Sequence, residues 1–161
     1  MIIQEPTRLF VPNTITWQVS RADGTVEPAI YVTNARTDAG ANAIAQLCGL
    51  AGALPFAFVG LSADLTAVVK TDTALTGELT LNGLARKAVT YGGFVGPTVV
   101  NGVASFTQTT AWTATANAQS INKIAAFTAI SGGIMGFATI LSSTTVLNNG
   151  DTGNLTWGFN V

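Results

Sequence analysis

The chain contains no histidine, a single cysteine (Cys48), and only seven basic and eight acidic side chains in 161 residues. Without histidine, Ser-His-Asp and Cys-His catalysis are excluded. One cysteine excludes an internal disulfide, and these residues leave no ligand set for zinc. The apolar neighbours Leu47 and Leu50 favour Cys48 as a small core residue. We therefore expect no enzymatic activity, no cofactor and no bound metal.

Charge of either sign is scarce. Charged residues make up 9 % of the chain, against about 25 % in a typical domain. Apolar residues make up 48 %, and the mean hydropathy is +0.43. A soluble monomer normally carries more charge, so we expect much of the exterior to be buried against other subunits or partners. The alternative is a monomer covered by Thr, Ser, Asn and Gln. Beyond Arg86-Lys87 no basic cluster exists, so nucleic-acid binding is not expected.

Residues Ala39 to Ala63 carry no charge and are long enough to span a bilayer. However, five helix-breaking or turn-forming residues divide this run into a short helix and a short strand; they are Gly40, Gly49, Gly52, Pro55 and Gly60. The run also lacks flanking basic clusters and aromatic belts. We therefore expect no membrane insertion, and keep a membrane-active small protein only as a distant rival.

Most of the chain has the pattern of a mainly β fold. Thr14 to Ser20 alternates polar and apolar residues, as a half-buried strand does. Thr37-Asp38 is a cap for a helix over Ala39 to Gly49. Further strands are expected over Val26–Thr33, Leu54–Leu61, Ala85–Tyr91, Val103–Thr115, Ile121–Ala129, Ile134–Leu141 and Leu155–Val161, with glycine-containing connections at Ala22–Gly24, Gly92-Gly93, Asn101-Gly102, Ser131–Gly133 and Asn149–Asp151. The prediction is an antiparallel β-sandwich or barrel-like domain with one short helix.

The first thirteen residues differ from the rest of the chain. Pro6 and Pro12 favour an extended backbone and forbid a helix, so we expect an extended N-terminal arm over residues 1–13 and a single β-rich domain over residues 14–161. The arm carries apolar side chains that gain little from water, and it is expected to dock on its own domain or on a neighbouring subunit. The predicted partner-binding residues are Ile2, Ile3, Leu9, Phe10 and Val11.

Two groups of polar residues allow both a functional and a structural interpretation. Asp64, Asp72 and Glu78 could in principle form a glycosidase carboxylate pair. Loop solvation explains them better, with Asp72 capping a helical turn over Thr73 to Leu79 and Glu78 pairing with Arg86. Residues 148–152 contain oxygen ligands suited to calcium, but their Asn-Gly turn accounts for them without metal.

Three tryptophans, Trp17, Trp112 and Trp157, lie in alternating segments. They could form a platform on which sugars stack, or they could belong to the core or to a subunit interface. A tryptophan inside an alternating strand is more often buried. We therefore favour the core or interface and keep a carbohydrate-binding module as the alternative.

Two parts of the chain carry a resemblance. The first is Thr71–Leu79, followed by Gly83–Arg86 and Tyr91; the second is Ala126–Ala129, Ser131–Met135 and Asn149–Asp151 leading into Leu155-Thr156-Trp157. Together they resemble segments of small auxiliary virion structural proteins of tailed bacteriophages. The resemblance implies a capsid decoration (cement) protein or a minor tail or fibre component. Decoration proteins are typically β-rich homotrimers on the outer shell, with an N-terminal segment that reaches across capsid subunits.

The expected function is therefore non-enzymatic. We expect a capsid decoration protein that binds the outer capsid surface as a homotrimer, contacts the major capsid protein and stabilises the shell. Assembly is expected in the host cytoplasm. The alternative is a tail-fibre or host-recognition module that binds carbohydrate.

Overall fold

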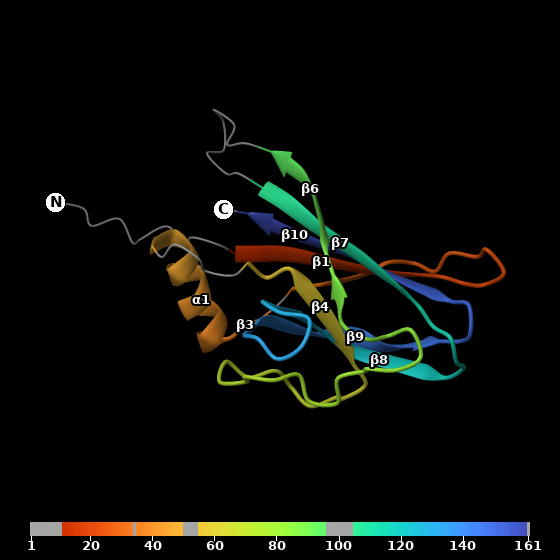
Figure 1. The fold of residues 1–161 in the computed structure, drawn as a ribbon. Helices are drawn as coiled ribbons and strands as arrows, with labels where there is room; N and C mark the ends of the chain where they lie inside the picture. The colour runs from red at the N-terminus through yellow and green to blue at the C-terminus, as the bar shows by residue number, and fades with distance from the viewer. Residues whose placement is uncertain (1–10, 34, 50–54, 96–104, 161) are drawn as a thin grey trace.

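Two antiparallel sheets of five strands each pack face to face as a sandwich, with one short helix beside them (Figure 1). The computed structural model describes residues 11–33, 35–49, 55–95 and 105–160. The first sheet has the strand order β2-β1-β10-β7-β6 and the second has β3-β9-β8-β4-β5. The predicted mainly β sandwich is confirmed.

Each sheet takes strands from both halves of the chain. The first sheet contains β1 (Val11–Ser20), β2 (Ile30–Val32), β6 (Thr90–Val95), β7 (Ser105–Thr113) and β10 (Thr152–Asn160). The second contains β3 (Ala35–Arg36), β4 (Phe58–Ser62), β5 (Lys87–Ala88), β8 (Gln119–Phe127) and β9 (Met135–Leu147). The helix α1 covers Asp38–Gly49.

The three tryptophans lie in the core between the sheets. Trp17, Trp112 and Trp157 are all 0 % exposed. The rings of Trp17 and Trp112 lie 6.1 Å apart, and Trp157 makes an edge contact with Phe137 of the opposite sheet. The period-two alternation of β1 places Ile15 on the same inner face. Three fully buried indoles cannot stack on a sugar, so the tryptophan platform is wrong and the core assignment is confirmed.

The outer face of the first sheet carries hydroxyl groups. The strand register aligns Thr16 with Thr156, Thr156 with Thr109, and Thr109 with Thr90, so four threonines form one row across β1, β10, β7 and β6. Tyr31 of β2 continues this row opposite Thr16. An outer face covered by threonine is what the alternative, a monomer covered by Thr, Ser, Asn and Gln, predicts for this sheet.

The second sheet is buried on both faces. Along β8 every residue from Ile121 to Phe127 is buried. Ile124 belongs to the core between the sheets, whereas Ala125 and Phe127 pack with Leu75 in a separate cluster. Leu75 lies in the long segment of residues 63–86, so this segment covers the outer side of the second sheet (Figure 1).

The helix begins where the sequence predicts. Thr37 is the cap, because its Oγ1 accepts a hydrogen bond from the backbone N–H of Gly40 at 3.0 Å. The helix packs against β9 very closely at Gly40, where an added Cβ would lie 2.0 Å from the backbone oxygen of Gly136. The side chain of Cys48 lies outside the described residues.

The helical turn predicted over Thr73 to Leu79 is wrong. The segment is irregular, with a bridge from Glu78 to Ser62 and a positive φ of 67° at Gly77. Asp72 is not a cap for it: its Oδ2 accepts from the N–H of Val69, three residues earlier, and so closes the preceding turn. The burial of Leu75 on the outer side of the second sheet outweighs the local preference for a helical turn.

Several strand limits differ from the predictions. The strand expected over Val26–Thr33 is reduced to Ile30–Val32, after Pro28, apart from one isolated bridge at Val26. The strand expected over Leu54–Leu61 begins only at Phe58. The Gly92-Gly93 pair lies inside β6, next to an irregularity in the register, and is not a connection.

Two strands are longer than predicted. β9 continues through Ser142 to Thr145 as far as Leu147, and β1 begins at Val11, inside the predicted arm. The connection predicted at Asn101-Gly102 lies outside the described residues. In the part of the chain that the structure describes, no helix is long and apolar enough to cross a membrane.

Candidate interaction surface

Arg86 joins two loops on the outer side of the second sheet. Its Nε and Nη2 donate to the two carboxylate oxygens of Glu78 at 2.8 and 2.7 Å. Its Nη1 donates to the backbone oxygens of Ala129 and Gly132 at 2.8 and 2.7 Å. The guanidinium carbon lies 3.4 Å from the centroid of the Phe127 ring. The predicted pair of Glu78 and Arg86 is confirmed, and Arg86 also fixes the β8–β9 connection.

The Arg86 pair is largely withdrawn from water. The side chains of Arg86 and Glu78 are 8 % and 21 % exposed. Gly60 of β4 makes room for it, because a Cβ there would lie 2.8 Å from Oε1 of Glu78. A two-hydrogen-bond pair at low exposure has a fixed geometry, unlike a typical surface ion pair. Arg86 therefore holds residues 63–86 and 128–134, which we call the joined loops, in one arrangement.

Lys123 and Asp64 form a second ion pair, which attaches residues 63–86 to β8. The Lys123 ammonium donates to Oδ2 of Asp64, and its side chain is only 5 % exposed. Asp64 also accepts from the hydroxyl of Thr66, and Ser62 Oγ donates to the backbone oxygen of Thr76 at 2.6 Å. The start, middle and end of residues 63–86 are thus all attached to the second sheet.

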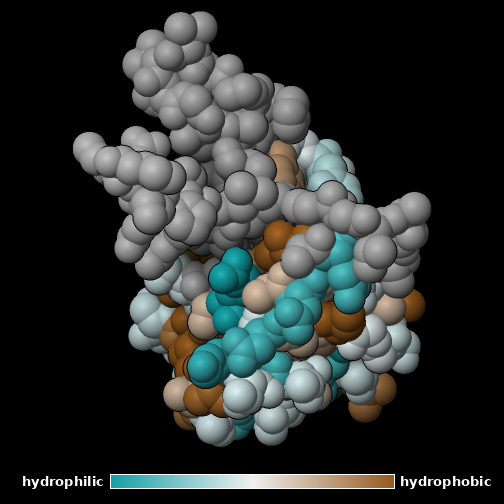
Figure 2. Space-filling view, turned by 90° about the vertical axis from the view of Figure 1, so that its left-hand side faces the viewer, coloured by the Kyte–Doolittle hydropathy of each residue, from teal (hydrophilic) through white to brown (hydrophobic). Residues whose placement is uncertain are grey.

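The joined loops expose apolar side chains. Five of the nine large apolar side chains that are exposed among the described residues lie on them; they are Leu65, Val69, Leu81, Ile130 and Ile134. Leu65 is 68 % exposed and Ile130 is 61 % exposed. Figure 2, which faces the side that carries α1, shows hydrophobic patches directly beside hydrophilic ones. Apolar groups held on ordered loops are the usual anchors of a protein interface.

A second ionic network closes one end of the sandwich. Arg21 donates from Nε to Glu27 at 2.9 Å and from Nη1 to Asp151 at 2.6 Å. Asp151, 4 % exposed, also accepts from the backbone N–H groups of Ala22 and Asn148. Its oxygens are therefore used to hold the Asn148–Thr152 turn, which has a φ of 88° at Gly150. Among the described residues, no group of three acidic or cysteine side chains is placed to hold a metal ion.

We expect these carboxylates to make the fold sensitive to acid. The hydrogen bond from Lys123 lowers the pKa of Asp64 below its ordinary value of 3.8, and the N–H of Asn148 does the same for the pKa of Asp151. A carboxylate with a lowered folded pKa contributes stability that is complete above its ordinary value and is lost as the pH falls through the lowered one. The urea midpoint should therefore be steady from about pH 6 to about pH 5 and drop below about pH 4.

The control for acid sensitivity is Asp64→Asn, which removes one titrating carboxylate. This variant should be less stable than the parent at about pH 6, and the difference between the two should shrink toward about pH 3. A difference that stays constant over this range would show that Asp64 gives no pH-dependent stability.

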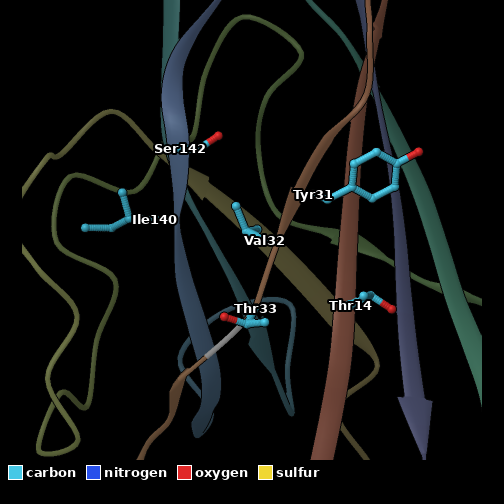
Figure 3. Close-up of a pocket in the computed structure, with 6 residues that line it drawn as sticks. All are labelled: Thr14, Tyr31, Val32, Thr33, Ile140 and Ser142. Carbon is cyan, nitrogen blue, oxygen red and sulfur yellow. The ribbon is translucent and has the colours of Figure 1, made fainter.

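A shallow groove lies on the surface of the sandwich, where β2 of the first sheet runs beside β9 of the second (Figure 3). It has a volume of about 420 Å³. Tyr31, Val32 and Thr33 line it from the β2 side, and Ile140 and Ser142 of β9 lie across from them, with Thr14 of β1 at one end. All six side chains are uncharged, and Tyr31 is 69 % exposed.

Of the predicted partner-binding residues, Ile2, Ile3, Leu9 and Phe10 lie outside the described residues. Val11 begins β1, where it pairs with Asn160 of β10; its side chain is also outside the description. Sequence reasoning missed the joined loops as a surface. Nothing local to Leu65 and Val69 indicates that the charged residues near them are engaged in internal ion pairs.

The three carboxylates considered for catalysis are each engaged in structural contacts: Asp64 with Lys123, Asp72 with the N–H of Val69, and Glu78 with Arg86. No protein-family model, curated protein or solved structure matches this chain.

Proposed function

We propose that the protein is a non-enzymatic virion structural protein, a capsid decoration protein that binds the outer shell as a homotrimer and stabilises it. In this proposal its partners are copies of itself and the major capsid protein, and it assembles in the host cytoplasm. The resemblance of Thr71–Leu79 and of the C-terminal segments to phage auxiliary virion proteins supports this choice. These residues include Glu78 and the turn glycines of the joined loops.

One observation carries the proposal: nearly half of the few charges are engaged in ion pairs within the fold, while apolar side chains are exposed on the joined loops. Three of the seven basic residues, Arg21, Arg86 and Lys123, are engaged in ion pairs with four of the eight acidic ones. The joined loops offer Leu65, Val69 and Ile130 on a scaffold that needs little ordering on binding. Pre-organised apolar anchors favour association because less conformational freedom is lost.

The mechanism is binding without turnover. A protein that binds the assembled shell and not its free subunits stabilises the shell by RT ln(1 + [L]/Kd) per site. Three subunits presented together raise the effective concentration of each contact, so weak single contacts give tight attachment. The joined loops would supply the apolar contacts to the shell, and the arm of residues 1–13 would supply further contacts, to a neighbouring subunit or to the shell.

The test is retention on empty capsids. The double variant Leu65→Ser with Ile130→Ser should lower capsid retention about tenfold or more, because two exposed apolar anchors are lost. Its urea midpoint should stay near that of the parent, since both side chains are exposed. The matched control is Val26→Ser with Val146→Ser, also exposed but outside the joined loops. Equal retention by the two double variants would remove the joined loops from the proposal.

A further inference from the structure

The groove beside β2 is bordered by strand edges that have no partner in the described residues. β2 is the end strand of the first sheet, and β1 covers only one of its edges. β3 pairs with β9 only at Phe137 and Ala138, so the part of β9 that carries Ile140 and Ser142 extends beyond it. Unpaired edges facing a groove are the usual acceptors of an added strand.

β1 offers a third such edge at the end of the groove. β2 pairs with β1 only from Ile15 to Trp17. Before Ile15, β1 pairs with β10 on one side and with no described strand on the other. Thr14, which lines the groove, lies in this part. A strand that continued the line of β2 would hydrogen-bond to the start of β1 and lie over the groove.

The side chains that line the groove determine which kind of strand would bind there. Tyr31, Val32 and Ile140 give apolar contacts, and Thr14, Thr33 and Ser142 contribute small hydroxyl-bearing side chains. The hydroxyl of Thr139 already donates to the backbone oxygen of Thr33 at 2.7 Å. Among the described residues no charged side chain lines the groove, so an occupant that buried a charge there would leave it unpaired, at high cost. An extended apolar segment fits best.

We infer that this groove receives the leading segment of a second copy of the chain, residues 1–10. This segment precedes the unpaired part of β1 and carries the apolar side chains Ile2, Ile3, Leu9 and Phe10. Ten extended residues reach about 33 Å. Pro6 lacks an N–H and is tolerated on an edge strand.

Residues 1–10 are assigned to the groove of a second copy, and not to the groove of their own chain, because they lack the residues that form a tight hairpin turn. To lie along its own β1, the segment would have to reverse in a hairpin just before Val11. Tight hairpin turns need glycine, asparagine or aspartate, and residues 1–10 contain none of them. A segment that leaves one subunit and adds a strand to the next forms a head-to-tail contact, which closes into a ring in a trimer. The inference rests on the proposed function for the trimer.

Disulfide trapping in the purified full-length protein tests the inference. Both chains carry Cys48→Ser, so that the native thiol cannot form a disulfide. One chain also carries Ile3→Cys, a second chain of different mass also carries Ser142→Cys, and the two are co-expressed and mildly oxidised. A disulfide between the two chains is the expected result. In the matched control Ser143→Cys replaces Ser142→Cys; Ser143 is also exposed, but it is not among the residues that line the groove. This control should give little cross-linking.

Two outcomes would overturn the inference. The first is a disulfide within one chain, in the double variant Ile3→Cys with Ser142→Cys, and none between chains. The second is equal cross-linking at positions 142 and 143. Because no capsid is present, the result is independent of capsid retention: cross-linked subunits that ignore capsids would contradict the proposed function and leave the exchanged segment in place.

A second variant gives a readout without cysteine. Ser142→Arg places a guanidinium in the groove, and it should weaken subunit association about tenfold or more in native mass spectrometry, because the charge would be buried without a partner. Ser143→Arg should associate like the parent. Parent-like association of Ser142→Arg would also count against the inference.

Discussion

Replacing Arg86 with alanine is expected to lower the free energy of unfolding by about 3 kcal/mol. Removal of one partner from a buried ion pair leaves the other charge without compensation, which costs about 3–5 kcal/mol. We expect the lower end of this range because the Glu78 carboxylate keeps some access to water. The substitution also leaves the carbonyl oxygens of Ala129 and Gly132 without their donor and removes the cation over the Phe127 ring. Urea denaturation measures the change.

The neighbouring residue provides the control. Lys87→Ala removes an exposed side chain whose ammonium donates to the backbone oxygen of Ala111, and it should change stability by about 0.5 kcal/mol or less. Arg86→Lys keeps the charge but cannot form the two-pronged pair, so it should fall between the parent and Arg86→Ala. If Arg86→Ala cost no more than Lys87→Ala, the joined loops would not depend on this pair.

Gly40→Ala is expected to have the other large effect. The new Cβ would lie 2.0 Å from the backbone oxygen of Gly136, and a backbone atom cannot turn aside as a side chain can. The helix α1 must therefore move away from β9, at a cost of about 1–3 kcal/mol or more, although alanine favours the helix more than glycine does. Chemical denaturation gives the change in stability, and hydrogen exchange should show faster opening of α1.

Asn42→Ala is the matched control on the same helix. Asn42 is exposed, so the substitution adds helix propensity with no close contact, and stability should rise slightly or stay unchanged. If Gly40→Ala were as stable as Asn42→Ala, the close packing of α1 on β9 would be disproved.

The sequence predicts the parts of the fold that depend on local chemistry. Alternation placed Trp17 in a strand with its side chain inward, and Thr37 marked the start of the helix. The pairing of Glu78 with Arg86 followed from the expectation that the chain folds back between them. In each case the deciding contacts lie within a few residues or result from the period of the strand.

The parts that could not be predicted depend on distant contacts. Residues 63–86 lie on the outer side of the second sheet because Leu75 meets Phe127, about a third of the chain away, and the local sequence favours a helical turn instead. Ser142 and Thr144 resemble a connection, yet β9 continues through them because its polar side chains are exposed on one edge of the sandwich. The exposure of Leu65 and Ile130 depends on the final arrangement of both loops.

We propose, above all, that this charge-poor chain completes its burial of apolar surface by binding other chains, first copies of itself and then the capsid. The decisive experiment is native mass spectrometry of the purified protein, followed by incubation with empty capsids. A trimer that remains bound to capsids after washing is the expected result. A monomer at high protein concentration that is washed from the capsids would refute the proposal.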